Sequence, residues 1–153
     1  MHPPFPALTA SAGALFSNAD GDILIVNPTY KDFWNLPGGA IDIDRNETPQ
    51  DATAREVREE LGITPPIGRL LVHAWISVPG RGAQVLYVFD GGVLSSEDQA
   101  AITLQEEELS EYRFCAPDSM VTGGLIPPHL TEVWQAALTA RGGQHPEVIT
   151  VRL

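Results

Sequence analysis

Cysteine is almost absent from this chain, and this excludes two kinds of covalent or metal stabilisation. Cys115 is the only cysteine among 153 residues, so the chain can form neither an internal disulfide nor a zinc site with several cysteine ligands. Such cysteine usage is typical of a protein from a reducing compartment. Because Cys115 follows Phe114 in an expected strand, we interpret it as a small core residue without chemistry of its own.

Basic residues are also scarce. The sequence has 9 Lys and Arg against 20 Asp and Glu, which gives a formal net charge of -11. This charge repels a polyphosphate backbone, so polymeric nucleic acid is not expected as a partner. A small phosphorylated substrate is compatible with the charge only if a divalent cation lies between the carboxylates and the phosphate oxygens.

Long apolar runs are missing as well. No stretch reaches the length of a transmembrane helix, and the first six residues, MHPPFP, lack the basic start and the apolar run of a signal peptide. We therefore expect a cytoplasmic protein with no membrane partner. The length and a hydrophobic fraction of 43% allow one sizeable core, so residues 1–153 are expected to form one domain.

Hydrophobic patterns and turn residues predict both strands and helices. The expected strands cover residues 10–16, 23–26, 67–78, 84–89 and 112–115, with hairpin turns at 18–22 and 79–82 and a loop at 27–33. The expected helices cover residues 49–61 and 130–140. The tail, residues 147–153, is either a strand or a frayed end. No repeat or linker separates these elements, so they predict one α+β core.

The first expected helix carries an unusual cluster of acidic residues. Thr48 and Asp51 suit a capping box at its start, and Gly62 suits its end. The residues that recur at helical spacing and predict its buried face are Ala54, Val57 and Leu61. The residues spaced i, i+3, i+4, which are expected together on a different face, are Glu56, Glu59 and Glu60.

This glutamate cluster has two interpretations. Like charges at these spacings repel by roughly 0.2–0.5 kcal/mol per pair, so a compensating cation is favourable. Carboxylate oxygens at this density are suitable ligands for Mg²⁺ or Mn²⁺. Alternatively, the cluster is only a solvated face with Arg55 and Arg58 as neighbouring ion-pair partners.

The surrounding residues favour the metal site, because residues 38–63 resemble the signature of the Nudix hydrolases. In that signature a glycine pair, a glutamate and the run Arg-Glu-apolar-x-Glu-Glu-x-Gly-apolar form a loop-helix-loop. Residues 55–63 match the run, and the seven residues between Glu47 and Arg55 keep the family spacing. Seven residues separate Gly39 from Glu47, where the family usually has five. The placement of Glu47 is therefore open, and Asp42 or Asp44 is an alternative for part of its role.

The resemblance implies a fold, a reaction and a set of site residues. The implied fold is an α/β/α sandwich with a mixed central sheet and a catalytic loop-helix-loop. Glu56, Glu59 and Glu60 would hold Mg²⁺, or Mn²⁺ in its place, beside the backbone of Gly39. The reaction would be hydrolysis of a diphosphate linkage, with Arg55 orienting a glutamate.

An acidic loop before a strand that ends in an aromatic residue often supplies the general base in relatives. Glu108 is the first candidate here and Glu107 the second, by their distance from Phe114. The alternative is that residues 106–108 form only an acidic solvated turn.

The group attached to the diphosphate is not specified by these residues. The aromatic residues that form either a stacking surface or ordinary core are Tyr30, Phe33, Trp34, Trp75 and Tyr87. Pro79 lies near a proline of some ADP-ribose-cleaving relatives, and this leans toward a nucleoside diphosphate derivative or a nucleoside triphosphate. The alternatives are a non-catalytic metabolite sensor and a prenyl diphosphate hydrolase, whereas the position of Cys115 gives no support to a diphosphate isomerase. Relatives are often dimers, so a homodimer is a further expectation.

Overall fold

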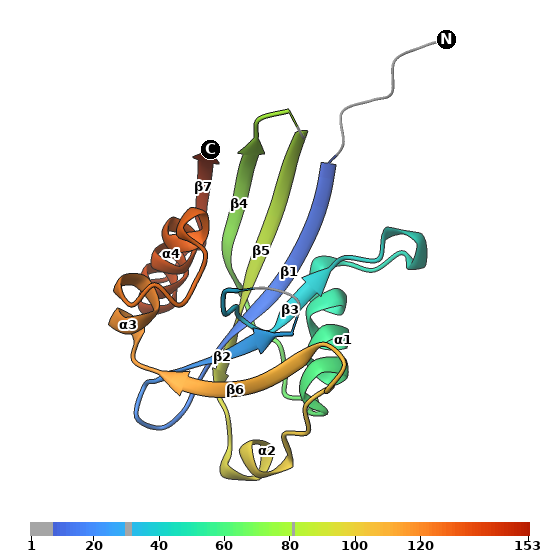
Figure 1. The fold of residues 1–153 in the computed structure, drawn as a ribbon, viewed down its shortest axis with the longest axis vertical. Helices are drawn as coiled ribbons and strands as arrows, with labels where there is room; N and C mark the ends of the chain where they lie inside the picture. The colour runs from blue at the N-terminus through green and yellow to red at the C-terminus, as the bar shows by residue number, and fades with distance from the viewer. Residues whose placement is uncertain (1–7, 30–31, 81) are drawn as a thin grey trace.

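A mixed β-sheet with helices on both sides forms the protein (Figure 1). The computed structural model describes residues 8–29, 32–80 and 82–153. The strands are β1 (Leu8–Ser17), β2 (Ile23–Pro28), β3 (Gly38–Ala40), β4 (Leu70–Val78), β5 (Gly82–Val93), β6 (Leu109–Cys115) and β7 (Glu147–Arg152). The helices are α1 (Pro49–Leu61), α2 (Ser96–Ala101), α3 (Pro117–Thr122) and α4 (Thr131–Gly142), with short 3₁₀ turns at Ile43–Arg45 and Pro128–Leu130. This is the expected α+β fold.

The sheet contains parallel and antiparallel pairs. Its order is β6-β2-β1-β5-β4-β7, and β3 pairs with β1 outside this path. β1 runs parallel to β5, and β4 runs parallel to β7, whereas the pairs β1–β2, β2–β6 and β4–β5 are antiparallel. The tail is therefore a strand at the sheet edge rather than a frayed end.

The hairpin of β1 and β2 opens directly after its turn. Ser17 and Ile23 are its paired positions, and β2 then follows β6 at a steep inclination to β4 and β5 in Figure 1. The segment before β3 fills part of the gap, since the Ala14 N–H donates to the Pro37 carbonyl at 3.0 Å and the Val26 N–H donates to the Asn35 carbonyl at 2.8 Å. This opening positions the candidate site.

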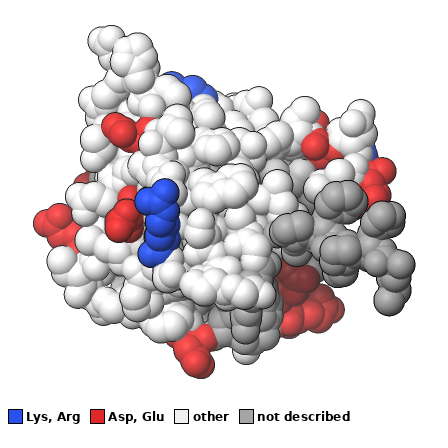
Figure 2. Space-filling model, turned by 90° about the horizontal axis from the view of Figure 1, so that it is seen from above, with Lys and Arg blue, Asp and Glu red and all other residues white. Residues whose placement is uncertain are grey.

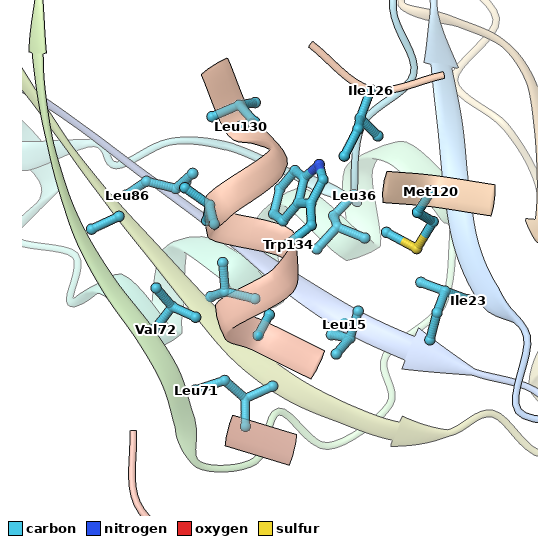
Figure 3. Packing of buried hydrophobic residues seen from close by; sticks show 14 of the residues in the cluster. Leu15, Ile23, Leu36, Leu71, Val72, Leu86, Met120, Ile126, Leu130 and Trp134 are labelled. Carbon is cyan, nitrogen blue, oxygen red and sulfur yellow. The ribbon is translucent and has the colours of Figure 1, made fainter. Parts of the chain in front are cut away.

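Two apolar clusters pack on the two faces of the sheet. Alternate residues of β1 point to opposite faces, so Leu15 joins the cluster beneath α4, and Ala14 and Phe16 join the cluster beneath α1. Figure 3 shows the first cluster around Trp134 of α4. Cys115 is half-buried against this cluster, and burial raises the pKa of its thiol. α1 and α4 therefore form the two outer layers of the expected sandwich.

The capping signals of the first helix are confirmed. The Asp51 N–H donates to Thr48 Oγ at 3.1 Å, and the Thr48 N–H donates to Asp51 Oδ2 at 3.2 Å. Gly62 ends the helix with φ 69°, a conformation that glycine adopts without steric strain.

The expected buried face of α1 was partly wrong. Ala54 is exposed, whereas Ala52 and Thr53 are buried together with Val57 and Leu61. Thr53 is buried without penalty because its hydroxyl donates to the Pro49 carbonyl at 2.9 Å. Glu60 is also buried, at 7% exposure, so the three glutamates do not share an open face.

The remaining elements differ from expectation mainly in length. β4 begins at Leu70 rather than residue 67, whereas β5 and β6 are longer than expected. The sequence patterns missed α2, α3 and β3, each of six residues or fewer, because such short elements show little periodicity. Within the described part of the chain, no helix is long and apolar enough to cross a membrane.

Candidate active site

The glycine pair brings the backbone close to two neighbouring elements. A Cβ at Gly38 would lie 2.6 Å from the Gly13 Cα and would also overlap the Ala12 carbonyl. A Cβ at Gly39 would lie 2.6 Å from the Glu56 carboxylate carbon. Both separations are shorter than real Cβ contacts. A side chain at Gly38 would push β3 away from the backbone of β1, whereas a side chain at Gly39 would displace the Glu56 carboxylate.

Arg55 is the centre of the ion-pair network on α1. Its Nε and Nη2 donate to the two oxygens of Glu47 at 2.6 and 3.0 Å. Its Nη1 donates to Glu56 Oε1 at 3.0 Å and to Glu59 Oε2 at 3.1 Å, and Nη2 also reaches the Ala40 carbonyl at 3.0 Å. One planar guanidinium thus fixes three carboxylates and the end of β3.

Glu47 keeps its place in this network despite the longer loop. Its hydrogen bonds from Arg55, and then from the Asp42 N–H at 2.8 Å, lower its pKa from 4.5 to about 2. The Asp42 side chain instead pairs with Arg45 at 3.1 Å. The loop includes a surface turn in which Ile43 is 73% exposed, so the longer connection leaves the Arg55–Glu47 contact intact.

Glu60 and Glu56 are carboxylates whose burial opposes ionisation. Burial raises the pKa of Glu60 from 4.5 to about 8, and the N–H of Gly38, at 3.2 Å from Oε2, only partly opposes this. Burial also raises the pKa of Glu56, although the Arg55 hydrogen bond acts in the opposite direction. Among the described residues, no basic side chain forms an ion pair with Glu60. Glu59 differs from both, since its side chain is 44% exposed.

The acidic loop before β6 is attached to the end of α1. The Thr103 N–H donates to the Leu61 carbonyl at 2.8 Å, and the Gln105 N–H donates to the Glu60 carbonyl at 3.1 Å. Glu108 is exposed, and its negative charge helps to raise the pKa of both Glu56 and Glu60. The loop therefore brings Glu108 near the glutamates of α1.

A cavity of ≈ 670 Å³ opens beside these residues, in the gap between β1 and β2. Its acidic lining residues are Asp32, Glu60 and Glu108. Its apolar lining residues include Val26, Phe33, Leu36, Leu86, Val88, Leu109, Leu130 and Trp134. The described lining contains no Lys or Arg, so the protein itself offers little positive charge to an anionic ligand there.

The described carboxylates around the cavity are suitable ligands for a divalent cation, although they do not form a complete metal site in advance. Within residues 8–29, 32–80 and 82–153, no three acidic, histidine or cysteine side chains converge as a ready-made metal site. Glu60 nevertheless presents a buried carboxylate to a cavity whose described lining contains no Lys or Arg, and an ion would supply the missing charge. Hard oxygen donors supplemented by water are the usual surroundings of Mg²⁺.

A family model described as NUDIX domain matches residues 7–140. The chain belongs to the NUDIX domain family.

Named relatives agree with this membership. An uncharacterized Nudix hydrolase of Pseudomonas aeruginosa is 28% identical over 127 residues, which cover 80% of this chain and 71% of the relative. A MutT-like protein of Streptomyces ambofaciens is 34% identical over 109 residues, 69% of this chain and 70% of the relative. The crystal structure of a MutT protein from Methanosarcina mazei Go1 has a TM-score of 0.73 at 23% identity, covering 91% of this chain and 99% of that one.

The aromatic residues considered as stacking surfaces are distributed unevenly in this NUDIX domain. Phe33 lines the cavity. Trp34 is buried, and the Arg113 guanidinium lies 4.3 Å from its ring centroid. Tyr87 packs edge-on against His73, and Trp75 lies outside the cavity lining.

Two other residues that the sequence suggested for contact with the group attached to the diphosphate are not among the described residues of the cavity lining. Pro79 lies in the turn after β4 and does not line the cavity, and Tyr30 lies outside the described residues. The sequence pattern missed Trp134 as a cavity residue, because an aromatic residue in an amphipathic helix is indistinguishable from ordinary core.

Proposed function

We propose that this NUDIX domain is a divalent-metal-dependent pyrophosphohydrolase that cleaves a nucleoside diphosphate derivative or a nucleoside triphosphate. Glu60 carries the proposal: it is a buried carboxylate on the wall of a cavity, without a basic partner among the described residues. Such a group is unfavourable in isolation and becomes favourable with a cation beside it.

Glu56, Glu59 and Glu60 would hold Mg²⁺, or Mn²⁺, together with the backbone of Gly39. When bound, the ion would neutralise the diphosphate and make the attacking water more acidic. The absence of Lys and Arg from the described lining supports this role for the ion, because the protein's own residues there provide hydrogen-bond acceptors rather than positive charge.

Arg55 would act as a positioning residue. Its contacts with Glu47, Glu56 and Glu59 fix the direction of carboxylates that would otherwise repel one another. A ligand set held in advance loses less conformational freedom when it binds. The Arg55 guanidinium already donates to these carboxylates and to the Ala40 carbonyl, so direct contact with substrate is not part of the proposal.

Glu108 would be the general base that accepts a proton from the attacking water. It is the member of the acidic loop that lines the cavity, whereas Glu106 and Glu107 lie outside the lining. The exposure of Glu108 suits a group that must exchange its proton with solvent after each turnover.

A prenyl diphosphate is the second candidate substrate, because several walls of the cavity are apolar. A hydrolysis screen tests both candidates. The protein would be incubated with nucleoside triphosphates, ADP-ribose, nucleotide sugars, dinucleoside polyphosphates and prenyl diphosphates, in Mg²⁺ and in excess chelator. We expect the wild-type protein to cleave nucleotide substrates only when metal is present. The Glu60→Gln variant should cleave them more slowly.

Binding without cleavage of any compound would contradict the proposal and favour a metabolite sensor. Full activity after removal of metal would contradict the metal requirement. A homodimer and a cytoplasmic location stay predictions. Light scattering after size-exclusion chromatography tests the first, and cell fractionation tests the second.

A further inference from the structure

Trp134 carries a buried hydrogen-bond donor that the fold does not use. The residue lies on α4 and is 3% exposed. Its indole Nε1 is buried and has no acceptor among the described residues. Buried indole N–H groups normally have a partner, because an unpaired donor in an apolar environment is unfavourable. A phenylalanine would fill similar space without this penalty.

The position of Trp134 connects this donor to the cavity. Trp134 lines the cavity together with Leu36, Leu86, Pro127 and Leu130. Figure 3 shows the nitrogen-bearing edge of the indole turned toward Ile126, directly before Pro127 in the chain, and away from Leu15 and Leu71 in the core. Ile126 is itself buried and lies outside the cavity lining, so the donor faces the buried start of the segment that continues into the cavity wall at Pro127.

We infer that Trp134 is a specificity-determining residue, whose indole N–H donates a hydrogen bond to the group attached to the diphosphate. The inference rests on the proposed function and narrows its substrate class. A nucleobase is planar and presents carbonyl oxygens and ring nitrogens as acceptors. A prenyl chain presents none and would leave the donor unpaired. A site with a buried polar group discriminates strongly against ligands that cannot pair with it.

Contact with the donor requires a local adjustment. The nitrogen is covered by the surrounding protein, so neighbouring apolar side chains must shift when an acceptor reaches it. Ile126, which the nitrogen faces in Figure 3, belongs to the connection between α3 and α4 rather than to the sheet, as do the cavity-lining residues Pro127 and Leu130.

The Trp134→Phe variant tests the inference, since it removes the donor and keeps an aromatic ring. Steady-state kinetics would compare a nucleotide that the wild-type protein cleaves with inorganic tripolyphosphate, which has no base. We expect kcat/KM for the nucleotide to fall about 3- to 10-fold, mainly through KM, as for the loss of one neutral hydrogen bond. The ratio of nucleotide to tripolyphosphate cleavage should therefore fall by about the same factor. Trp75→Phe is the matched control, because Trp75 is 41% exposed and lies outside the cavity lining.

An NMR titration gives a second measurement that does not depend on turnover. The indole ¹H–¹⁵N signal of Trp134 can be assigned by its loss in Trp134→Phe. Adding each of the four common nucleoside monophosphates to the wild-type protein should move that signal downfield for at least one base, and geranyl diphosphate should not. If the variant fails to fold, isotope labelling with residue-by-residue assignment of the wild-type protein supplies the same signal.

The outcomes distinguish failure of the proposed function from failure of the inference about Trp134. If the wild-type protein cleaves no diphosphate, the proposed function fails. If it cleaves nucleotides, but Trp134→Phe keeps the same ratio of nucleotide to tripolyphosphate cleavage, the inference is overturned and the proposed function stands. A Trp134 signal that no nucleotide moves, or a preference for prenyl diphosphates, also overturns the inference.

Discussion

Ionisation of Glu60 should control the stability of the metal-free protein. Burial raises the pKa of this carboxyl from 4.5 to about 8. The folded protein therefore binds the Glu60 proton more tightly than the unfolded chain does. Stability is highest while Glu60 is protonated in both states, and it falls as the pH rises from about 4.5 through about 8.

The magnitude follows from the same two values. At about 1.4 kcal/mol per pKa unit, the difference between 4.5 and about 8 corresponds to about 5 kcal/mol above pH 8 and to about 3 kcal/mol at pH 7. Both energies are a large part of the roughly 5–15 kcal/mol that stabilises a typical domain. The raised pKa of Glu56 acts in the same direction. The lowered pKa of Glu47 stabilises the folded state at every pH in this range, and this stabilisation is lost only as the pH falls from about 4.5 through about 2.

Replacing Glu60 by Gln removes the ionisation and keeps the shape. Urea denaturation followed by circular dichroism, in excess chelator, would give the free energy of unfolding at about pH 5.5, 7 and 8.5. The wild-type protein should lose stability across this range, whereas Glu60→Gln should change much less and should be the more stable protein at the highest pH. The control is Glu59→Gln, since the 44% exposed Glu59 side chain is already largely hydrated.

Magnesium should reverse the difference in stability between the wild-type protein and Glu60→Gln at high pH. An ion that binds only the folded state adds stability in proportion to the logarithm of its concentration over its dissociation constant, and the wild-type protein should gain more than Glu60→Gln at about pH 8. The reasoning is refuted if wild-type stability in chelator stays constant from about pH 5.5 to 8.5, or if Glu60→Gln loses as much as the wild-type protein.

Three further predictions concern neighbouring groups. Arg55→Lys cannot contact both oxygens of Glu47 in the same way and should lower the free energy of unfolding by about 1–3 kcal/mol, measured by urea denaturation; an unchanged value would show that the network contributes little. Gly39→Ala should raise the Mg²⁺ concentration needed for half-maximal activity, because its Cβ would meet the Glu56 carboxylate, and an unchanged metal titration would contradict that contact. Glu108→Gln should lower turnover by ~10²–10⁴-fold without rescue by excess Mg²⁺, with Glu107→Gln as the control, and a greater loss in the control would assign the base one residue earlier.

The sequence predicted the helix of the site well because its signals are local. The Thr48–Asp51 cap and the Gly62 stop act within one turn of their own helix. The contact of Arg55 with carboxylates also follows partly from helical spacing, since Glu59 is four residues away. Such features depend little on how the rest of the chain packs.

Features that depend on tertiary packing were harder to predict. Helical periodicity placed Ala54 in the core and Glu60 outside it, and the structure shows the reverse. The reason is that β3 and the acidic loop contact α1 from directions that the helix pattern does not contain. Trp134 was missed as a cavity residue for a related reason, because the cavity exists only where β1 and β2 diverge.

The divergence of β1 and β2 gives this enzyme a particular evolutionary freedom. Glu60 reaches the cavity from the α1 layer, and Trp134 reaches it from the α4 layer on the other face of the sheet. Substitutions in α4 and in the connection before it can reshape one wall without touching the Arg55 network. Descendants of such a chain can change which compound they degrade while inheriting the same hydrolytic apparatus intact.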